Sequence, residues 1–230
     1  MTAASSTHGG PGTQSDHRAV IFADLAGYTA LTEAHGDTGA ADVAERFFEL
    51  TASVLQADAR IVKTIGDAVM VVASAASDGL EIGLSVLHAV EREPHFPGVR
   101  VGVHYGPTVE RNGDIFGATV NVAARLSAHA HVGQLLTTST VATLFASHDH
   151  LTTTALGATW LKNIAEPVEV YWVADHTPDA TAQVLDPVCR MFVDAESAPA
   201  RLPWGERGWH FCSFECASTF SQDPERYASG

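Results

Sequence analysis

Residues 61–72 read IVKTIGDAVMVV, two short apolar runs joined by Gly66 and Asp67. Apolar runs rich in β-branched residues, joined by a Gly-Asp dipeptide, are typical of a β-hairpin with a tight two-residue turn. The hairpin also carries Lys63 in its first arm, and turn chemistry accounts for the aspartate but not for the lysine. This stretch therefore predicts a strand pair that holds two opposite charges, one of them without a structural explanation.

Hydrophobic periodicity on both sides of the hairpin predicts the fold class. The elements expected in chain order are a strand at 18–25, a helix within 38–57, the hairpin, a helix at 76–91, a strand at 99–106 and a helix at 118–130. The stretches 133–145 and 161–173 add a strand, a helix and a final strand. This order fits an α+β fold with a ferredoxin-like βαββαβ core that carries added strands and helices.

The charge balance restricts the partners of the chain. Thirteen Lys and Arg residues stand against 27 Asp and Glu residues, which gives a net charge of −14. Nucleic acid is therefore not an expected partner, because phosphate backbones are bound by clustered basic residues. A polyphosphate could bind only through divalent cations held by acidic residues. The sequence holds no apolar run of about 18–20 residues, so we expect no membrane span.

Composition divides the chain into four predicted segments. Residues 1–17 are small and polar and have no apolar block like that of a secretory signal, so we expect a disordered segment and a cytoplasmic location. Residues 18–174 form the large domain, and the polar stretch 175–183 is a linker. Residues 184–230 form a small C-terminal domain. It is too short to bury much core, so we expect a bound metal to stabilise it.

Polar residues of the large domain fall into three short stretches. Taken singly, each has a purely structural explanation, such as a turn cap or a solvated helix face. Their joint occurrence favours a functional site instead. The candidate residues are Asp24 at the end of a strand, Lys63 and Asp67 in the hairpin, Asp114, and Asn121 and Arg125, which lie four apart on one helix face.

With these residues, positions 18–173 resemble the class III nucleotidyl cyclases. The resemblance implies that Asp24 and Asp67 bind two Mg²⁺ or Mn²⁺ ions and that Lys63 and Asp114 select the base. It also implies that Asn121 orients the ribose and that Arg125 stabilises the reacting phosphate. In that family one domain supplies the metal-binding aspartates and the other supplies the remaining groups. This chain has one such domain with every group, so we expect a homodimer with two equivalent sites.

The chemistry of these groups supports the same roles. Two carboxylates suffice for magnesium, which completes its octahedron with phosphate oxygens and water. A guanidinium stays charged and can stabilise the charge that develops on the α-phosphate. Lysine donates and an ionised aspartate accepts, which matches the acceptor N1 and the amino donor of adenine, so ATP is the expected substrate.

All three cysteines, Cys189, Cys212 and Cys216, lie in the C-terminal domain. An odd number of cysteines without a secretory signal favours a metal site over a disulfide framework. Their spacing resembles the YHS domain, a relative of TRASH-type metal-binding modules, with Arg190 where that family usually has glycine. Three thiolates suit Zn²⁺ or another soft metal such as Cu⁺. His210 is the candidate for a fourth ligand, and the alternative is three buried cysteines without metal.

Several functions remain open from the sequence. The favoured one is a homodimeric adenylate cyclase that converts ATP to 3′,5′-cyclic AMP and pyrophosphate, with a C-terminal module that responds to metal or redox state. The alternatives are a guanylate cyclase, a catalytically silent cyclase-like module that binds a nucleotide or a partner, and a protein that mainly handles metal. The stretch AHGDTGAADVAERF at 34–47 could alter the region around the site.

Overall fold

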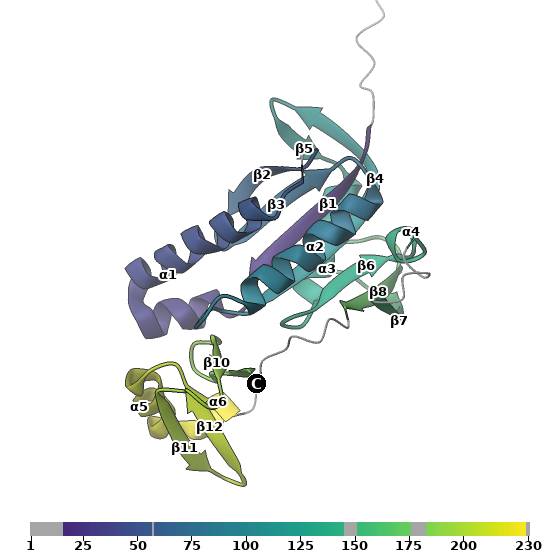
Figure 1. Cartoon of the computed structure of the whole chain (residues 1–230). Helices are drawn as coiled ribbons and strands as arrows, with labels where there is room; N and C mark the ends of the chain where they lie inside the picture. Colours follow the sequence, from purple (N-terminus) through teal and green to yellow (C-terminus); the bar gives the residue numbers. More distant parts are fainter. Residues whose placement is uncertain (1–15, 57, 145–150, 176–182, 229–230) are drawn as a thin grey trace, which may run out of the picture.

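A computed structural model describes residues 16–56, 58–144, 151–175 and 183–228 (Figure 1). Most of the predicted disordered segment and of the predicted linker lies outside these residues. The first strand begins at Asp16, two residues before the predicted strand. Among the described residues, no helix combines the length and the apolar character that a membrane span requires.

The large domain is an α+β fold built on one mixed sheet, with the strand order β2-β3-β1-β4-β6-β8-β7 and β5 paired to β4. The first four strands in this order pair with one another antiparallel, which is the ferredoxin-like arrangement predicted from the sequence, and β6 then pairs parallel to β4. The elements are β1 (Asp16–Leu25), α1 (Tyr28–Ser53), β2 (Arg60–Ile65), β3 (Ala68–Ala73), α2 (Ala76–Glu91), β4 (Val99–Arg111), β5 (Asp114–Phe116), α3 (Ala118–His129), β6 (Leu135–Thr138), α4 (Ser139–Ala142), β7 (Leu151–Thr159) and β8 (Val168–Asp175).

The strand β7 was not predicted. Its sequence, LTTTALGAT, leaves most side chains partly or fully exposed, because β7 is the edge strand beyond β8. A register shift between Ala155 and Gly157 interrupts its pairing. An edge strand of this kind lacks the apolar alternation that sequence analysis depends on.

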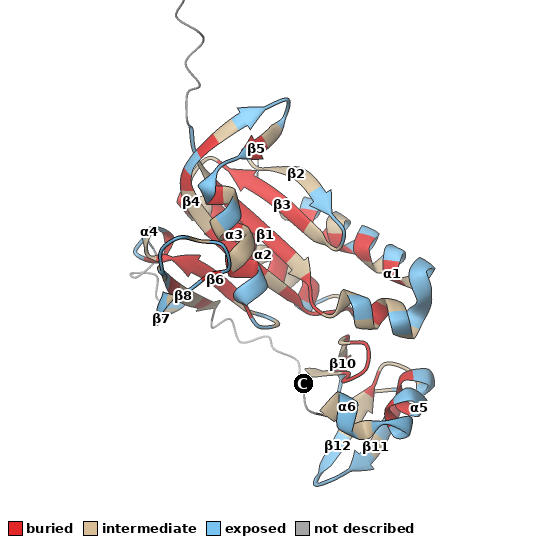
Figure 2. Cartoon of the chain, turned by 180° about the vertical axis from the view of Figure 1, so that it is seen from behind, coloured by how far each residue is buried: buried red, intermediate tan, exposed pale blue. Residues whose placement is uncertain are grey.

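Helices cover the two faces of the sheet. Alternate residues of β1 pack with α1 and α2 on one face, including Ile21, whereas Phe22 packs with Ala123 of α3 on the other. At Gly102 the backbone of α3 comes so close that a Cβ atom would lie 2.3 Å from the carbonyl oxygen of Ala123. Because Gly102 has no side chain, α3 can pack directly on β4. Figure 2 shows the central strands buried and the tips of the β2 and β4–β5 hairpins exposed.

The helix α1 is kinked. Gly36 has a φ of 76° and a ψ of 168°, which divide the helix into two parts. A Cβ atom at Gly36 would meet nothing within 4 Å, so the positive φ alone explains the glycine. The kink follows His35, which ends the first part of α1.

The C-terminal domain consists of β9 (Gln183–Leu185), β10 (Phe192–Asp194), β11 (Ala200–Trp204), β12 (Arg207–Phe211), α5 (Phe214–Gln222) and α6 (Pro224–Ala228). It packs against the first part of α1 (Figure 1). Leu31 and Ala40 of α1 share one buried apolar cluster with Phe211 and Phe220. The backbone N–H of Phe192 also donates to the carbonyl oxygen of Phe96 at 2.9 Å. The two domains therefore share one buried apolar cluster and a backbone hydrogen bond.

Candidate functional site

An aspartate pairs with an arginine where β1 ends beside the β2–β3 turn. The guanidinium of Arg100 donates to Asp24, and the backbone N–H of Leu25 donates to the carbonyl oxygen of Asp67 at 3.3 Å. Burial raises the pKa of Asp24, Arg100 partly offsets this effect, and the negative charge of Asp67 raises the pKa further. The fold thus holds two carboxylates close enough to repel each other, which is a donor set that suits cations.

Lys63 and Asp114 form an ion pair between β2 and β5. The Nζ atom of Lys63 lies 2.8 and 2.7 Å from the two carboxylate oxygens of Asp114. Hydrogen bonding from Lys63 lowers the pKa of Asp114, and the backbone N–H of Ile115 adds to this effect at 2.8 Å. The Nζ atom also lies 5.7 Å from the ring centroid of Phe116. One donor and one acceptor therefore lie side by side on a half-exposed surface.

Strand register places Asp24 and Arg100 on the α3 face of the sheet. They lie directly opposite each other on β1 and β4. Val20 and Phe22 pack with Ala123 of α3, and side chains alternate along a strand, so Asp24 points to the same face.

The remaining candidates also lie on that face. Lys63 lies opposite Met70, which belongs to the cluster beneath α3. Asn121 is exposed on α3 and Arg125 is partly buried there. In the part of the chain that the structure describes, neither side chain has a hydrogen bond or an ion pair. Arg125 is thus a guanidinium without an internal partner on the face that carries the other groups.

The Asp24–Arg100 pair joins β1 and β4, whereas the Lys63–Asp114 pair joins β2 and β5. Asp24 lies opposite Arg100 at the start of β4, whereas Asp114 lies opposite Arg111 at its end. One chain therefore brings the candidates together as two groups and does not combine them. Arg100 is an addition that sequence analysis missed, because an arginine within an alternating strand gives no signal until the strand pairing is known.

Residues 12–175 match the family model described as "Adenylate and Guanylate cyclase catalytic domain". The chain belongs to this cyclase family. Residues 184–230 match the model of the YHS domain. Both matches confirm the resemblances seen in the sequence.

Curated relatives of the cyclase domain include two bacterial proteins named adenylate cyclase. The one from Glutamicibacter nicotianae is 35% identical over 150 residues, which is 65% of this chain and 37% of the relative. The one from Streptomyces griseus is 41% identical over 113 residues, which is 48% of this chain and 28% of the relative. The chain thus spans about a third of the length of these relatives.

Solved structures show the same cyclase fold. An adenylate/guanylate cyclase/hydrolase from Silicibacter pomeroyi is 32% identical with a TM-score of 0.62, covering 69% of this chain and 96% of that chain. The adenylyl cyclase CyaB from P. aeruginosa is 22% identical with a TM-score of 0.62, covering 72% of this chain and 97% of that chain. The second similarity concerns the fold alone.

The three cysteines of the C-terminal domain lie together as unpaired thiols. The sulfur of Cys212 is 3.4 Å from that of Cys189 and 3.7 Å from that of Cys216. Hydrogen bonds from Cys189 and Cys212 lower the pKa of Cys216, which favours a thiolate within the group.

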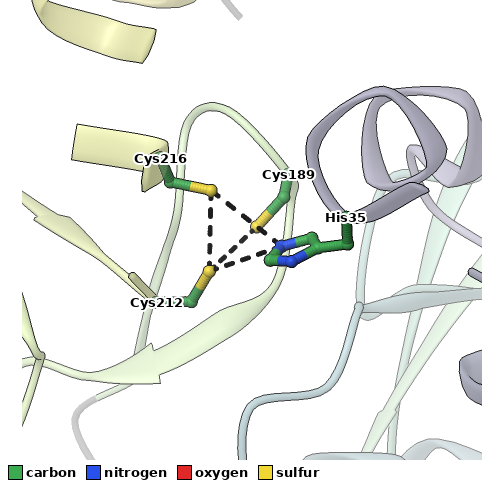
Figure 3. Close-up of side chains that lie close together, drawn as sticks. All are labelled: His35, Cys189, Cys212 and Cys216. Atoms are coloured by element: carbon green, nitrogen blue, oxygen red, sulfur yellow. Dashed lines mark hydrogen bonds between the residues drawn. The ribbon is translucent and has the colours of Figure 1, made fainter. Parts of the chain in front are cut away.

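The fourth side chain at this cluster is His35, and the expectation for His210 was wrong. His35 comes from α1 of the cyclase domain, and its ligand nitrogen and the three sulfurs lie within 4.8 Å of one another (Figure 3). His210 lies on β12 opposite Arg201 and is not part of this group. The sequence gives no reason to select His35, since no spacing rule connects it to cysteines more than 150 positions away.

Arg190 keeps the turn that glycine would favour. Its φ is 66°, and its backbone N–H donates to the carbonyl oxygen of Asp186 at 3.0 Å. Arg190, which stands where the YHS family usually has glycine, therefore adopts the left-handed backbone conformation that glycine would favour. The side chain of Arg190 packs over Gly27, where a Cβ atom would lie 2.6 Å from its Cγ atom.

Proposed function

We propose that the chain is an adenylate cyclase that converts ATP to 3′,5′-cyclic AMP and pyrophosphate at two equivalent sites in a homodimer. The observation that carries this proposal is that the polar groups form two separate sets. Asp24 and Asp67 lie where β1 ends beside the β2–β3 turn, whereas the donor and acceptor pair Lys63–Asp114 joins β2 to β5. Family membership and the names of the relatives support the reaction class.

Asp24 and Asp67 fit a pair of divalent cations. Burial and the nearby negative charge of Asp67 disfavour the ionised form of Asp24, and bound cations would relieve that cost. Both side chains offer only oxygen ligands, which Mg²⁺ and Mn²⁺ prefer. When bound, these ions would neutralise the triphosphate and lower the pKa of the ribose 3′-hydroxyl.

Residues of the chain supply the fixed positive charge. Arg125 has no internal partner among the described residues, so it is available to stabilise charge on the α-phosphate as pyrophosphate leaves. The guanidinium of Arg100 donates to Asp24. When cations bind the carboxylates, this guanidinium can turn toward the polyphosphate. Asn121, one helical turn before Arg125, offers an amide that can orient the ribose.

Lys63 and Asp114 favour adenine. In the free chain the amine of Lys63 donates to the carboxylate of Asp114 at 2.7–2.8 Å. A bound base must therefore break this ion pair and form one hydrogen bond with each side chain. Adenine presents an acceptor and a donor that match lysine and aspartate. Guanine presents the opposite polarity, and each unpaired group costs about 1–3 kcal/mol, or about 5- to 150-fold in binding.

A symmetric dimer would bring the two groups together. The metal-binding carboxylates of one protomer would face Lys63, Asp114, Asn121 and Arg125 of its partner, and symmetry would repeat this arrangement. Ile65 and Phe116, which flank the polar groups on β2 and β5, are 49% and 48% exposed. Their exposure gives this face apolar area for contact with a second copy.

The test is an assay of the purified chain with Mn²⁺ and either ATP or GTP, measuring both cyclic nucleotides. We expect cyclic AMP to dominate, Asp67→Ala to abolish its formation, and Arg125→Ala to reduce kcat/KM on the order of 100-fold, equivalent to about 3 kcal/mol. The matched controls, Asp42→Ala on the exposed side of α1 and Arg92→Ala after α2, should retain activity. Preferential formation of cyclic GMP would refute the base assignment, and absence of both products would refute the enzyme.

A further inference from the structure

Four potential metal ligands converge where the two domains meet. Cys189, Cys212 and Cys216 belong to the C-terminal domain, and His35 belongs to α1 of the cyclase domain (Figure 3). The Nε2 atom of His35 is 3.7 Å from the sulfur of Cys212 and 3.9 Å from that of Cys216. The histidine therefore completes a set whose other members come from the opposite side of the domain interface.

These separations match a tetrahedral zinc site. With Zn–S and Zn–N bonds of about 2.3 and 2.0 Å, ligand atoms at tetrahedral angles lie about 3.5–3.8 Å apart. Four of the six separations between these ligand atoms range from 3.4 to 3.9 Å, and all six are within 4.8 Å. Hydrogen-bonded thiols explain contacts between pairs of sulfurs, but they do not explain why an imidazole from another domain occupies the fourth vertex.

The cysteine ligands are held by structure of their own. Asp186 is fully buried, and its carboxylate accepts from the backbone N–H groups of Val188 and Cys212, both at 2.8 Å. This one side chain therefore fixes the loop before Cys189 relative to the strand end that carries Cys212. Ser213 caps α5 by accepting from the backbone N–H of Cys216 at 3.1 Å.

His35 is held by the kink of α1. It precedes Gly36, where the left-handed φ interrupts the helix. Leu31, one turn earlier, is fully buried in the cluster that contains Cys189 and Phe220. Residues spaced by four lie on the same helix face, so the packing of Leu31 directs His35 toward the sulfurs.

We propose that these four residues bind one Zn²⁺ ion and that His35 thereby fastens the C-terminal domain to the first part of α1. Binding releases the remaining thiol protons and yields three thiolates and one neutral imidazole. A mixed sulfur and nitrogen set in tetrahedral geometry suits Zn²⁺. Because α1 begins only four residues after Asp24, the ion would also connect the C-terminal domain to the helix that follows the first residue of the cyclase site. The zinc site does not depend on the proposed catalytic activity.

The experiment compares the full-length chain with His35→Ala and with the matched control His210→Ala. The first readout is zinc content by mass spectrometry, with affinity from competition against a chromogenic chelator. The second is the absorption of the Co²⁺-substituted protein, which reports tetrahedral geometry and thiolate ligation. The third is amide hydrogen exchange of residues 28–35 before and after removal of metal by a chelator. His35 is exposed, so the alanine variant should fold.

We expect one zinc per chain in the unmodified protein and in His210→Ala. Loss of a residue that only supports a metal ligand typically weakens metal binding about 10- to 100-fold. His35 is proposed as a direct ligand, so His35→Ala should weaken zinc binding by more than this. Its Co²⁺ spectrum should change, and metal removal should no longer alter exchange in residues 28–35. An affinity and Co²⁺ spectrum of His35→Ala equal to those of the unmodified protein would overturn His35 as a ligand. Absence of bound zinc in the unmodified protein, or copper in its place, would overturn the site as a zinc site.

Discussion

Two variants that are inactive alone should restore activity when their subunits mix. Asp67→Ala removes a carboxylate from the turn between β2 and β3, and Arg125→Ala removes a guanidinium from α3. If the site combines the carboxylates of one protomer with α3 of its partner, a mixed dimer contains one site with both defects. Its second site has neither defect.

The expected recovery follows from this arrangement. Random exchange between equal amounts of the variants makes about half of the dimers mixed, and each mixed dimer has one intact site out of two. About a quarter of the unmodified activity should therefore return. The control mixture, Asp67→Ala with Asp24→Ala, should stay inactive, since both carboxylates belong to the same half of every site.

The assay measures cyclic AMP from Mn-ATP after co-incubation, and native mass spectrometry of subunits with different tags verifies exchange. A mixture of Asp67→Ala and Arg125→Ala that exchanges fully, yet remains as inactive as its parents, would refute the shared site. Equal recovery in the control mixture would also refute it, because recovery would then not depend on which half of the site carries the defect.

Three further perturbations have definite expected outcomes. Asp24→Asn should abolish cyclic AMP formation. It should also raise the melting temperature of the metal-free protein near neutral pH, because the raised pKa of Asp24 means that the fold disfavours its charge. A lower melting temperature would contradict this. Leu31→Ala should lower the free energy of unfolding by about 2.7–5 kcal/mol and speed amide hydrogen exchange in the C-terminal domain. The matched variant Leu50→Ala should instead speed exchange in the cyclase core. Burial lowers the pKa of His104, so the unfolded chain takes up a proton that the folded chain resists as the pH falls below about 6.5. The urea midpoint of the unmodified protein should therefore decline more steeply with acid than that of His104→Gln, and parallel declines would count against this assignment.

Local pattern predicted the sheet core well. The apolar runs around Gly66 and Asp67 gave the hairpin, and the helical stripe at 76–91 coincides with α2. The strand β3 is a continuous buried apolar run and α2 has buried residues along a helical face, so their sequences carry the signal directly. The extension of α1 back to Tyr28 escaped prediction, because the left-handed Gly36 interrupts the periodic stripe.

The sequence by itself determined which chemical groups the candidate sites contain: carboxylates, the amine of Lys63, an amide and a guanidinium on one helix face, and three thiols. Their types and short-range spacings are written along the chain. Only the tertiary structure decided which of them meet. Arg100 joins Asp24 through strand pairing, and His35 joins the cysteines through packing of α1 on the C-terminal domain. The physical reason is that ion pairing and metal ligation act over a few ångströms in space, and burial of apolar surface brings together residues that no sequence period relates.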